Sequence, residues 1–323
     1  MDAVSSTGTT TDTGHLLLKR WVAWLIASLF LLCLSSNSLA APRNVLVLYE
    51  SEKPFVTELI HSIKEHITDD IHIHFQKYQP DTPLSPEDKS NRDLIIGIGY
   101  RISKSLSKQK LQLPILNLLV PLTTTSQFRS NSPRYASLVI DQPFSRQFLM
   151  IREAFGNSTR TGLVTGKSSA RLKDQIKNAA QQNHIPLNYS HIDNSEELIA
   201  VLKQLFSNSE VLLVTPDPLI YNRKTIRSIL LLSYRQRIPV IGYTQSYTKA
   251  GAAIAMYSTA SQIGEHTSEI IYDFFNAGKK FNSNIIEPRY FSIDINQKVS
   301  RSLGLDLPDA NVLKKKIHAD EIR

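Results

Sequence analysis

EVLLVTPDPLIYNRKTIRSILLLSYRQRIPVIGYTQSYTKAGAAIAMYSTASQIGEHTSEIIYDFF, residues 210–275, decides the fold of this chain. A short apolar run and a Pro-Asp-Pro turn come first, followed by a helical pattern, two more apolar runs and a further helical pattern. This alternation predicts a parallel sheet covered by helices, with a cleft at the ends of its strands. The expected strand ends carry no nucleophile–base pair, so we predict no enzyme activity.

Short apolar runs of the same kind continue along the rest of the chain and are typical of strands covered on both faces. Four strands are expected before residue 141 and four after it, which predicts two α/β halves, each with its own sheet. Helical patterns lie between the strands: one is expected to start at Pro54, one to be capped by Ser195, and the last to stop near Gly278. The expected strands are 44–49, 93–99, 114–120, 135–141, 160–166, 210–215, 239–244 and 252–257, with 71–76 as an extra strand.

The N-terminal segment has the pattern of a secretory signal. Lys19 and Arg20 precede an apolar run over residues 21–34, which is short for a membrane span of about 20 residues. Small residues follow, and cleavage is expected after Ala40, which would place the mature protein in the periplasm. An uncleaved signal anchor is the alternative, because the polar segment before Lys19 is long. Cys33, the single cysteine, lies within this signal, so the mature chain is expected to contain no disulfide.

Charge narrows the classes of partner. The 37 Lys and Arg residues exceed the 29 Asp and Glu residues, giving a net charge of +8. These charges are dispersed, and the single basic cluster is 314–316. We therefore expect no nucleic-acid partner.

The residues at the expected strand ends form the candidate ligand site. They are glycines, which let backbone N–H groups approach a ligand, together with tyrosines and charged side chains. Glu50 and Asp217 could hold an ammonium group and Arg101 or Lys167 a carboxylate, which would suit an amino acid or a similar zwitterion. Asp217 is equally consistent with a turn residue or a helix cap. The candidate ligand-binding residues are Glu50, Ser51, Gly99, Tyr100, Arg101, Thr165, Asp217, Gly242, Tyr243 and Tyr257.

Two further patterns are too incomplete to indicate a metal or a cofactor. His72 and His74 alternate on an expected strand and share one face, but a third ligand is missing nearby. Gly97 and Gly99 follow a strand without the third glycine of a dinucleotide-binding motif. No metal and no cofactor are therefore expected.

The chain resembles a known family over roughly residues 93 to 305. The matching segments include DLIIGIGYRISKSL (93–106), LPILNLLVP (113–121) and the run from 138 to 166. More specific are the strand with its PDP turn leading to RIPVIGY (211–243) and AGAAIAMYSTASQIGEHTSEII (250–271), followed by a closing segment, 288–305. Together they resemble the ABC-transporter substrate-binding proteins of the tryptophan/tyrosine-type group.

This resemblance implies the type I periplasmic-binding-protein-like fold, with two doubly wound parallel-sheet lobes joined by three crossovers. The crossovers would lie near 140–142, 256–258 and 281–289. Lobe 1 would comprise 43–140 plus 258–281 and lobe 2 would comprise 141–257 plus 282–323, after a signal at 1–40. The resemblance also implies that Asp217, at the position that faces the amino group of the ligand in this family, does so here, and that the loop around Gly242 lines the cleft.

The sequence departs from the family pattern at the expected pocket. The first half is short between Phe75 and Asp93, Tyr100 and Arg101 replace a small-residue turn, and 120–123 replaces a Thr-Asp or Ser-Asp pair. The functional expectation is a monomeric periplasmic protein that binds a small solute, closes by hinge motion and delivers the solute to an ABC permease in the inner membrane. The departures leave open a periplasmic ligand sensor or accessory protein of the same fold, acting on a membrane signalling partner. An enzyme using Glu50 and Asp217 as paired carboxylates is the third alternative.

Overall fold

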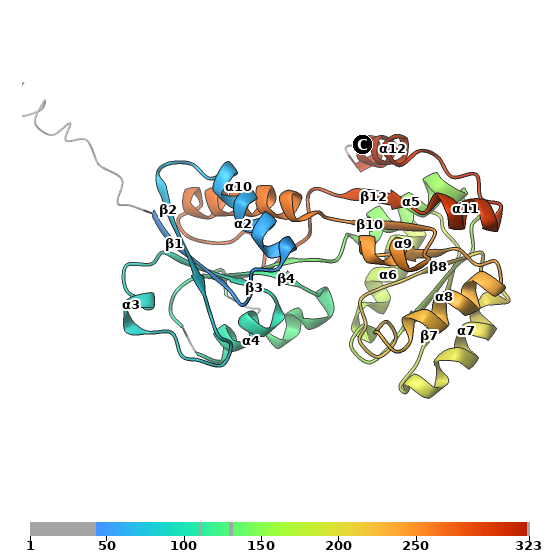
Figure 1. Cartoon of the computed structure of the whole chain (residues 1–323), viewed down its shortest axis with the longest axis horizontal. Coiled ribbons are helices and arrows are strands. Elements are labelled where there is room, and N and C mark those ends of the chain that lie inside the picture. Colours follow the sequence, from blue (N-terminus) through green and yellow to red (C-terminus); the bar gives the residue numbers. More distant parts are fainter. Residues whose placement is uncertain (1–42, 110, 129–131, 322–323) are drawn as a thin grey trace, which may run out of the picture. The chain divides into compact units, whose positions relative to one another are not determined.

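The computed structural model describes residues 43–109, 111–128 and 132–321 (Figure 1). The expected signal, with Lys19, Arg20, Cys33 and the cleavage site after Ala40, lies outside the described residues. In the part of the chain that is described, no helix is both long enough and apolar enough to cross a membrane.

The first lobe is built on a six-stranded sheet in which every pair of neighbours is parallel. Alternate residues of each strand face opposite cores, as the pleat requires. Val45 and Val47 join the core under α2 (Pro54–His66) and α10 (Ala260–Asn276), whereas Leu46 and Leu48 join the core under α4 (Tyr100–Lys108). In sheet order, the strands are β11 (Ile285–Ile286), β5 (Tyr135–Val139), β4 (Ile115–Val120), β3 (Leu94–Ile98), β1 (Arg43–Tyr49) and β2 (Ile71–Lys77). The helices are α2 (Pro54–His66), α3 (Pro86–Lys89), α4 (Tyr100–Lys108), the 3-10 helix η1 (Leu122–Gln127) and α10 (Ala260–Asn276).

The second lobe has its own six-stranded sheet, in which only β12 runs antiparallel, against β10. Its strands, in sheet order, are β12 (Ser292–Ile295), β10 (Ile254–Tyr257), β9 (Val240–Gly242), β8 (Val211–Leu213), β6 (Thr161–Thr165) and β7 (Leu187–His191). Its helices are α5 (Phe144–Phe155), α6 (Lys173–Gln182), α7 (Leu198–Phe206), α8 (Ile226–Arg235), α9 (Gln245–Ala250), α11 (Gln297–Leu303) and α12 (Ala310–Glu321), with 3-10 turns η2 (Ala170–Leu172) and η3 (Ser195–Glu197).

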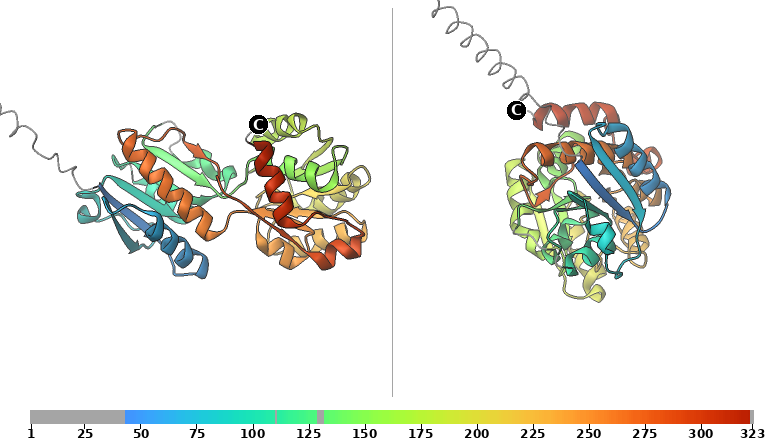
Figure 2. Two further views of the ribbon diagram at one scale, coloured as in Figure 1. Left: turned by 90° about the horizontal axis from the view of Figure 1, so that it is seen from above. Right: turned by 90° about the vertical axis from the view of Figure 1, so that its left-hand side faces the viewer.

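Three crossovers join the two sheets. The first lies between β5 and α5, the second between β10 and α10, and the third between β11 and β12. Since β11 pairs with β5 in the first sheet, the chain leaves lobe 1 after Ile286 and not after Phe281 as expected. After this crossover, α12 packs against α5 and β12 (Figure 2).

Several elements differ from the sequence-based expectation. Strand β7 was missed because it is a polar edge strand that buries no continuous apolar run, and β11 is only two residues long. Helices α4 and α12 were also missed. Helix α2 does begin at Pro54, but Ser195 makes no cap hydrogen bond and lies in the 3-10 turn before α7. Gly278, in a left-handed conformation at φ 70°, follows the end of α10.

Close packing of α2 on α10 depends on a glycine. A Cβ atom on Gly264 would lie 2.5 Å from Cβ of Ser62 and 3.0 Å from the carbonyl oxygen of Leu59. The Ser62 hydroxyl also donates a hydrogen bond to the Ser261 carbonyl across this contact, at 2.8 Å. Helix α2 lies beside α10 (Figure 1), and at this contact there is no room for a side chain at position 264.

We predict that Gly264→Ala lowers the free energy of unfolding by about 1–3 kcal/mol, because the added methyl forces the helices apart. Urea denaturation of both proteins measures the difference. The exposed substitution Ser261→Ala, on the same helix, is the control and should change stability by less than about 0.5 kcal/mol. Equal stability of Gly264→Ala and the wild type would show that this contact is not tight.

Candidate functional site

The charged residues after β1 and β3 pair with each other. Glu50 and Arg101, predicted to hold opposite ends of a ligand, form a half-exposed ion pair. Ser51 is half-buried next to Glu50, and Gly99 begins α4 with φ 95°. The Tyr100 hydroxyl donates to Oε1 of Gln127 at 2.8 Å. The structure thus brings these predicted residues together, and their role toward a ligand stays a prediction.

Asp217, 1% exposed, has both carboxylate oxygens occupied by its own lobe. Oδ2 accepts hydrogen bonds from the backbone N–H of Gly166 at 3.2 Å and of Ser169 at 3.0 Å, and from the Ser169 hydroxyl at 2.7 Å. Oδ1 accepts from the backbone N–H of Leu219 at 2.9 Å. A Cβ at position 166 would lie 2.9 Å from Oδ1, so the close approach requires glycine there. These bonds tie the turn after β6 to the turn after β8, which is the turn role that the sequence left open.

We predict that Asp217→Asn lowers the free energy of unfolding by about 1–3 kcal/mol without any ligand, because asparagine has one acceptor oxygen and its NH₂ group then faces an N–H donor at the other position. Chemical denaturation of the ligand-free protein tests this. The exposed substitution Asp69→Asn should be neutral to within about 0.5 kcal/mol. If the stability of Asp217→Asn were unchanged, the carboxylate would not have this turn role.

Three tyrosines gather where β8 and β9 end. Tyr243 follows Gly242 and its ring lies 4.8 Å from that of Tyr247. A Cβ at Gly242 would lie 2.3 Å from Cβ of Tyr247, so this glycine is required for packing. Burial, then the charge of Tyr243 and that of Asp217, raise the pKa of Tyr221. All three phenols are therefore neutral near pH 7 and can donate or accept hydrogen bonds.

The other predicted hydroxyls lie at the ends of their strands. The buried Thr165 hydroxyl, at the end of β6, lies 2.5 Å from the Tyr189 hydroxyl and 3.2 Å from Nδ1 of His191. Tyr257 ends β10 and is half-buried, and burial followed by the charge of Asp294 raises its pKa. Whether these residues bind a ligand stays a prediction.

The first crossover carries a buried carboxylate that the sequence reasoning did not select. Asp141 is 4% exposed, and its Oδ2 accepts a hydrogen bond from the backbone N–H of Leu122 at 2.6 Å. The other oxygen, Oδ1, is buried without a hydrogen-bond partner among the described residues. Burial above all, opposed by the Leu122 bond, raises the pKa of Asp141 to about 6.

Further polar atoms at the strand ends share this property. The hydroxyls of Thr123, after β4, and of Thr215, after β8, are buried without a partner in the described part of the chain, as is the phenol of Tyr221. Buried polar groups in proteins nearly always have hydrogen-bond partners, so such a group calls for a specific explanation. Unpartnered atoms at the strand ends of both lobes are consistent with a site completed by a polar ligand.

One sequence signal could have identified Asp141. It is the acidic residue that directly follows the apolar run 135–140, two residues before Pro143. The predicted strand 135–141 enclosed it, whereas β5 ends at Val139 and leaves Asp141 in the crossover. Leu119, at the end of β4, has φ 58° beside a register shift, so the backbone bends there before it reaches Thr123.

We predict that Asp141→Asn stabilises the ligand-free protein relative to the wild type above pH 6. The carboxyl pKa rises from 3.8 to about 6 on folding, so the ionised form is disfavoured in the native state. Stability therefore falls as pH rises from about 4 to about 6, and the full cost at neutral pH is about 3 kcal/mol.

Thermal unfolding of both proteins from pH 4 to 8 tests this, with the difference between them growing toward pH 6. His266 has the opposite sign: burial above all lowers its pKa to about 4, so its contribution to stability is lost as pH falls from 6.5 through 4. Both proteins contain His266, so its effect cancels in the difference. A difference that does not vary with pH would contradict the assignment.

Side-chain hydrogen bonds connect the three crossovers. Gln142 Nε2 donates to the Ser258 hydroxyl at 2.8 Å, and that hydroxyl donates to the Tyr290 carbonyl at 2.6 Å. Arg146, on α5, donates to Gln142 Oε1 at 2.8 Å and to the Pro288 carbonyl at 2.7 Å. Its Nε pairs with Oε1 of Glu321 on α12 at 2.5 Å.

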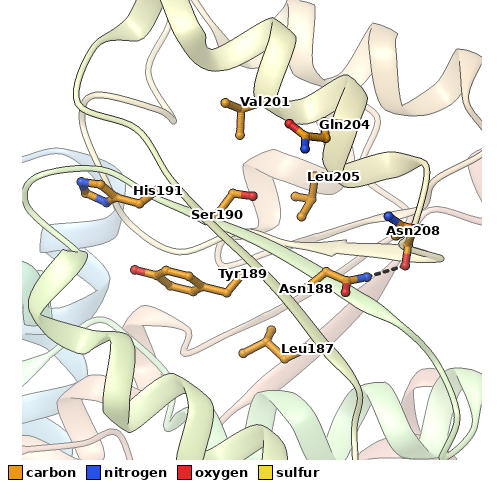
Figure 3. A pocket seen from close by; sticks show the side chains of 9 residues that line it. All are labelled: Leu187, Asn188, Tyr189, Ser190, His191, Val201, Gln204, Leu205 and Asn208. Atoms are coloured by element: carbon orange, nitrogen blue, oxygen red, sulfur yellow. Dashed lines mark hydrogen bonds between the residues drawn. The ribbon is translucent and has the colours of Figure 1, made fainter.

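Surface depressions lie elsewhere on the described chain. One of about 440 Å³ follows the edge strand β7 and faces α7 (Figure 3). Its lining includes Tyr189, His191 and Asn188, and the Asn188 amide donates to the carbonyl of Asn208. Another depression, of about 370 Å³, is lined by residues that include Arg171 and Thr125. Within the described residues, no group of three or more His, Cys, Asp or Glu side chains could hold a metal ion.

Comparisons with known proteins agree with this geometry. The model of the family described as "ABC transporter substrate binding protein" matches residues 87–319. No match was found among curated proteins.

Solved structures show the fold. A ligand-free, open substrate binding protein with adhesive properties from Clostridium difficile is 16% identical, with a TM-score of 0.62 over 83% of this chain and 96% of that chain. The ABC domain in complex with L-Trp from Streptococcus pneumoniae is 15% identical, with a TM-score of 0.55 over 85% of this chain and 98% of that one. A conserved domain protein from Vibrio cholerae has the same TM-score and coverage at 16% identity. The predicted type I periplasmic-binding fold with two lobes is thereby confirmed.

Proposed function

Because this chain belongs to the family of ABC transporter substrate binding proteins, we propose that it is the solute receptor of an ABC-type uptake system. It binds one small polar ligand, of amino-acid-like size, at the strand ends of its two lobes. It acts after export to the periplasm, as a monomer, and delivers the ligand to a permease in the inner membrane. It performs no chemistry on the ligand.

The observation that carries this proposal is the set of unpartnered buried polar atoms at the strand ends. Thr123 and Asp141 contribute from the side of the first sheet, and Thr215 and Tyr221 from the second lobe. A buried polar atom without any hydrogen-bond partner costs free energy, and a bound polar ligand would supply the partner that the protein does not provide.

Closure follows from the crossovers. Three short segments connect the lobes, so a rotation between lobes changes few backbone angles. A ligand that contacts both lobes binds the closed form more tightly and shifts the population toward it. The permease would then distinguish the loaded from the empty protein.

We expect a single class of small solute to raise the melting temperature of the protein comprising residues 41–323. A ligand at 100 times its dissociation constant adds about 2.7 kcal/mol of stability, a shift of several degrees. A panel of amino acids, short peptides, purines and sugars identifies the class. Small-angle scattering with and without the stabilising compound should show a smaller radius of gyration when it is bound.

If no compound stabilises the protein, the solute-receptor function is contradicted. A protein partner would then be sought, as for a sensor or accessory subunit of the same fold. Stabilisation without compaction would retain binding and reject hinge closure.

A further inference from the structure

Two buried carboxylates, Asp217 and Asp141, lie near the strand ends. They differ in how many hydrogen bonds they already accept from the protein. Asp217 accepts four hydrogen bonds from within its own lobe. Asp141 accepts one, from Leu122, and its Oδ1 has no partner among the described residues although the side chain is 4% exposed. A buried ionised oxygen without a partner is among the most costly groups a protein can keep.

We propose that Asp141 is the residue that binds the ligand, and that the ligand carries a protonated amine. The inference rests on the proposed function and adds to it the chemical class of the solute and the residue that recognises it. An ammonium group supplies what Oδ1 lacks, a charged hydrogen-bond donor. A neutral sugar or a carboxylate would leave the negative charge uncompensated.

None of the charged groups described around Asp141 forms a hydrogen bond or an ion pair with its Oδ1 atom. The charge of Arg171, in the turn after β6, lowers the pKa of Asp141, but its guanidinium donates to the Leu122 carbonyl and, at 3.1 Å, to the Thr125 hydroxyl. No Arg171–Asp141 ion pair within 4 Å is present in the described chain. Glu287, on the third crossover, adds negative charge. A cation therefore enters a negative environment with one fixed positive neighbour.

Tyr243 supplies a neighbour of the right kind from the second lobe. Burial, first of all, and the charges of Asp141 and Asp217 raise its pKa, so its phenol lies within electrostatic reach of both carboxylates. A neutral aromatic ring suits an ammonium, because the ring face attracts the cation. The ligand would touch the first crossover through Asp141 and the second lobe through Tyr243, which couples binding to hinge position.

The test uses paired probes. Each amino acid is compared with its N-acetyl derivative, and putrescine with 1,4-butanediol, in thermal-shift and calorimetric titrations of the wild type, Asp141→Asn and Glu287→Gln. Asp141→Asn keeps a side-chain oxygen for the Leu122 bond and removes the charge. Glu287→Gln is the control for charge alone, because it removes an exposed carboxylate that influences Asp141 from a distance and leaves Oδ1 of Asp141 in place.

We expect amines to bind the wild type and their acetylated or hydroxyl partners to bind at least 100-fold more weakly. Asp141→Asn should lose at least 100-fold in affinity for the amine while remaining folded, and Glu287→Gln should change by less than about 5-fold. Wild-type affinity should fall about tenfold per pH unit below pH 6, as Asp141 is protonated, and Asp141→Asn should lack this dependence.

The other outcomes are distinguishable. Wild-type binding of neutral or anionic compounds only would overturn the inference and retain the solute-receptor function. So would full amine affinity in Asp141→Asn. Failure of Asp141→Asn to fold would make Asp141 a structural residue and reject the inference. The absence of binding by every probe and every compound of the wider panel would contradict the proposed function together with the inference.

Discussion

The hydrogen bonds that connect the three crossovers are the constraint on which the rest of this structure depends. One core cluster contains residues of both lobes, such as Leu46 of β1 and Leu163 of β6, and the Arg171 guanidinium donates to the Leu122 carbonyl. The crossovers are the covalent connections between the two sheets. Gln142 and Ser258 link the first two crossovers, and Ser258 and Arg146 extend the connection to carbonyls of the third. The network also reaches α12 through Glu321. Because the three segments are hydrogen-bonded to one another, none of them is an independent linker.

Asp141 lies directly beside this network, one residue before Gln142, and that position explains its cost. Polar groups of the crossovers can form hydrogen bonds with one another, as Gln142 and Arg146 do. The Oδ1 atom of Asp141 accepts no hydrogen bond from any described residue. A fold under selection for stability alone has no reason to retain it, whereas a binding site has, because a ligand gains most where the empty protein is least satisfied.

The two aspartates show how far a residue pattern can be trusted. Asp217 lies between two prolines and was predicted both as a ligand group and as a turn residue, and its hydrogen bonds agree with the second reading. Glu50 and Arg101 were predicted to bind opposite ligand charges, and the structure pairs them with each other. In both cases the residue type correctly indicated a charged group that needs a partner. Which partner it finds depends on the tertiary structure.

The sequence by itself determined the alternation of strands and helices, two sheets, and the strand ends where polar residues gather. Continuous apolar runs such as 44–49 and 114–120 carry that information locally, since a strand buried on both faces can tolerate few polar residues. It also determined the family, through motifs spread over most of the chain. Only the tertiary structure decided that β7 and β11 are strands, because β7 is polar without a continuous apolar run and β11 has only two residues. It alone decided which buried oxygens lack partners, since a hydrogen bond between residues such as 142 and 258 depends on distances that no local pattern encodes.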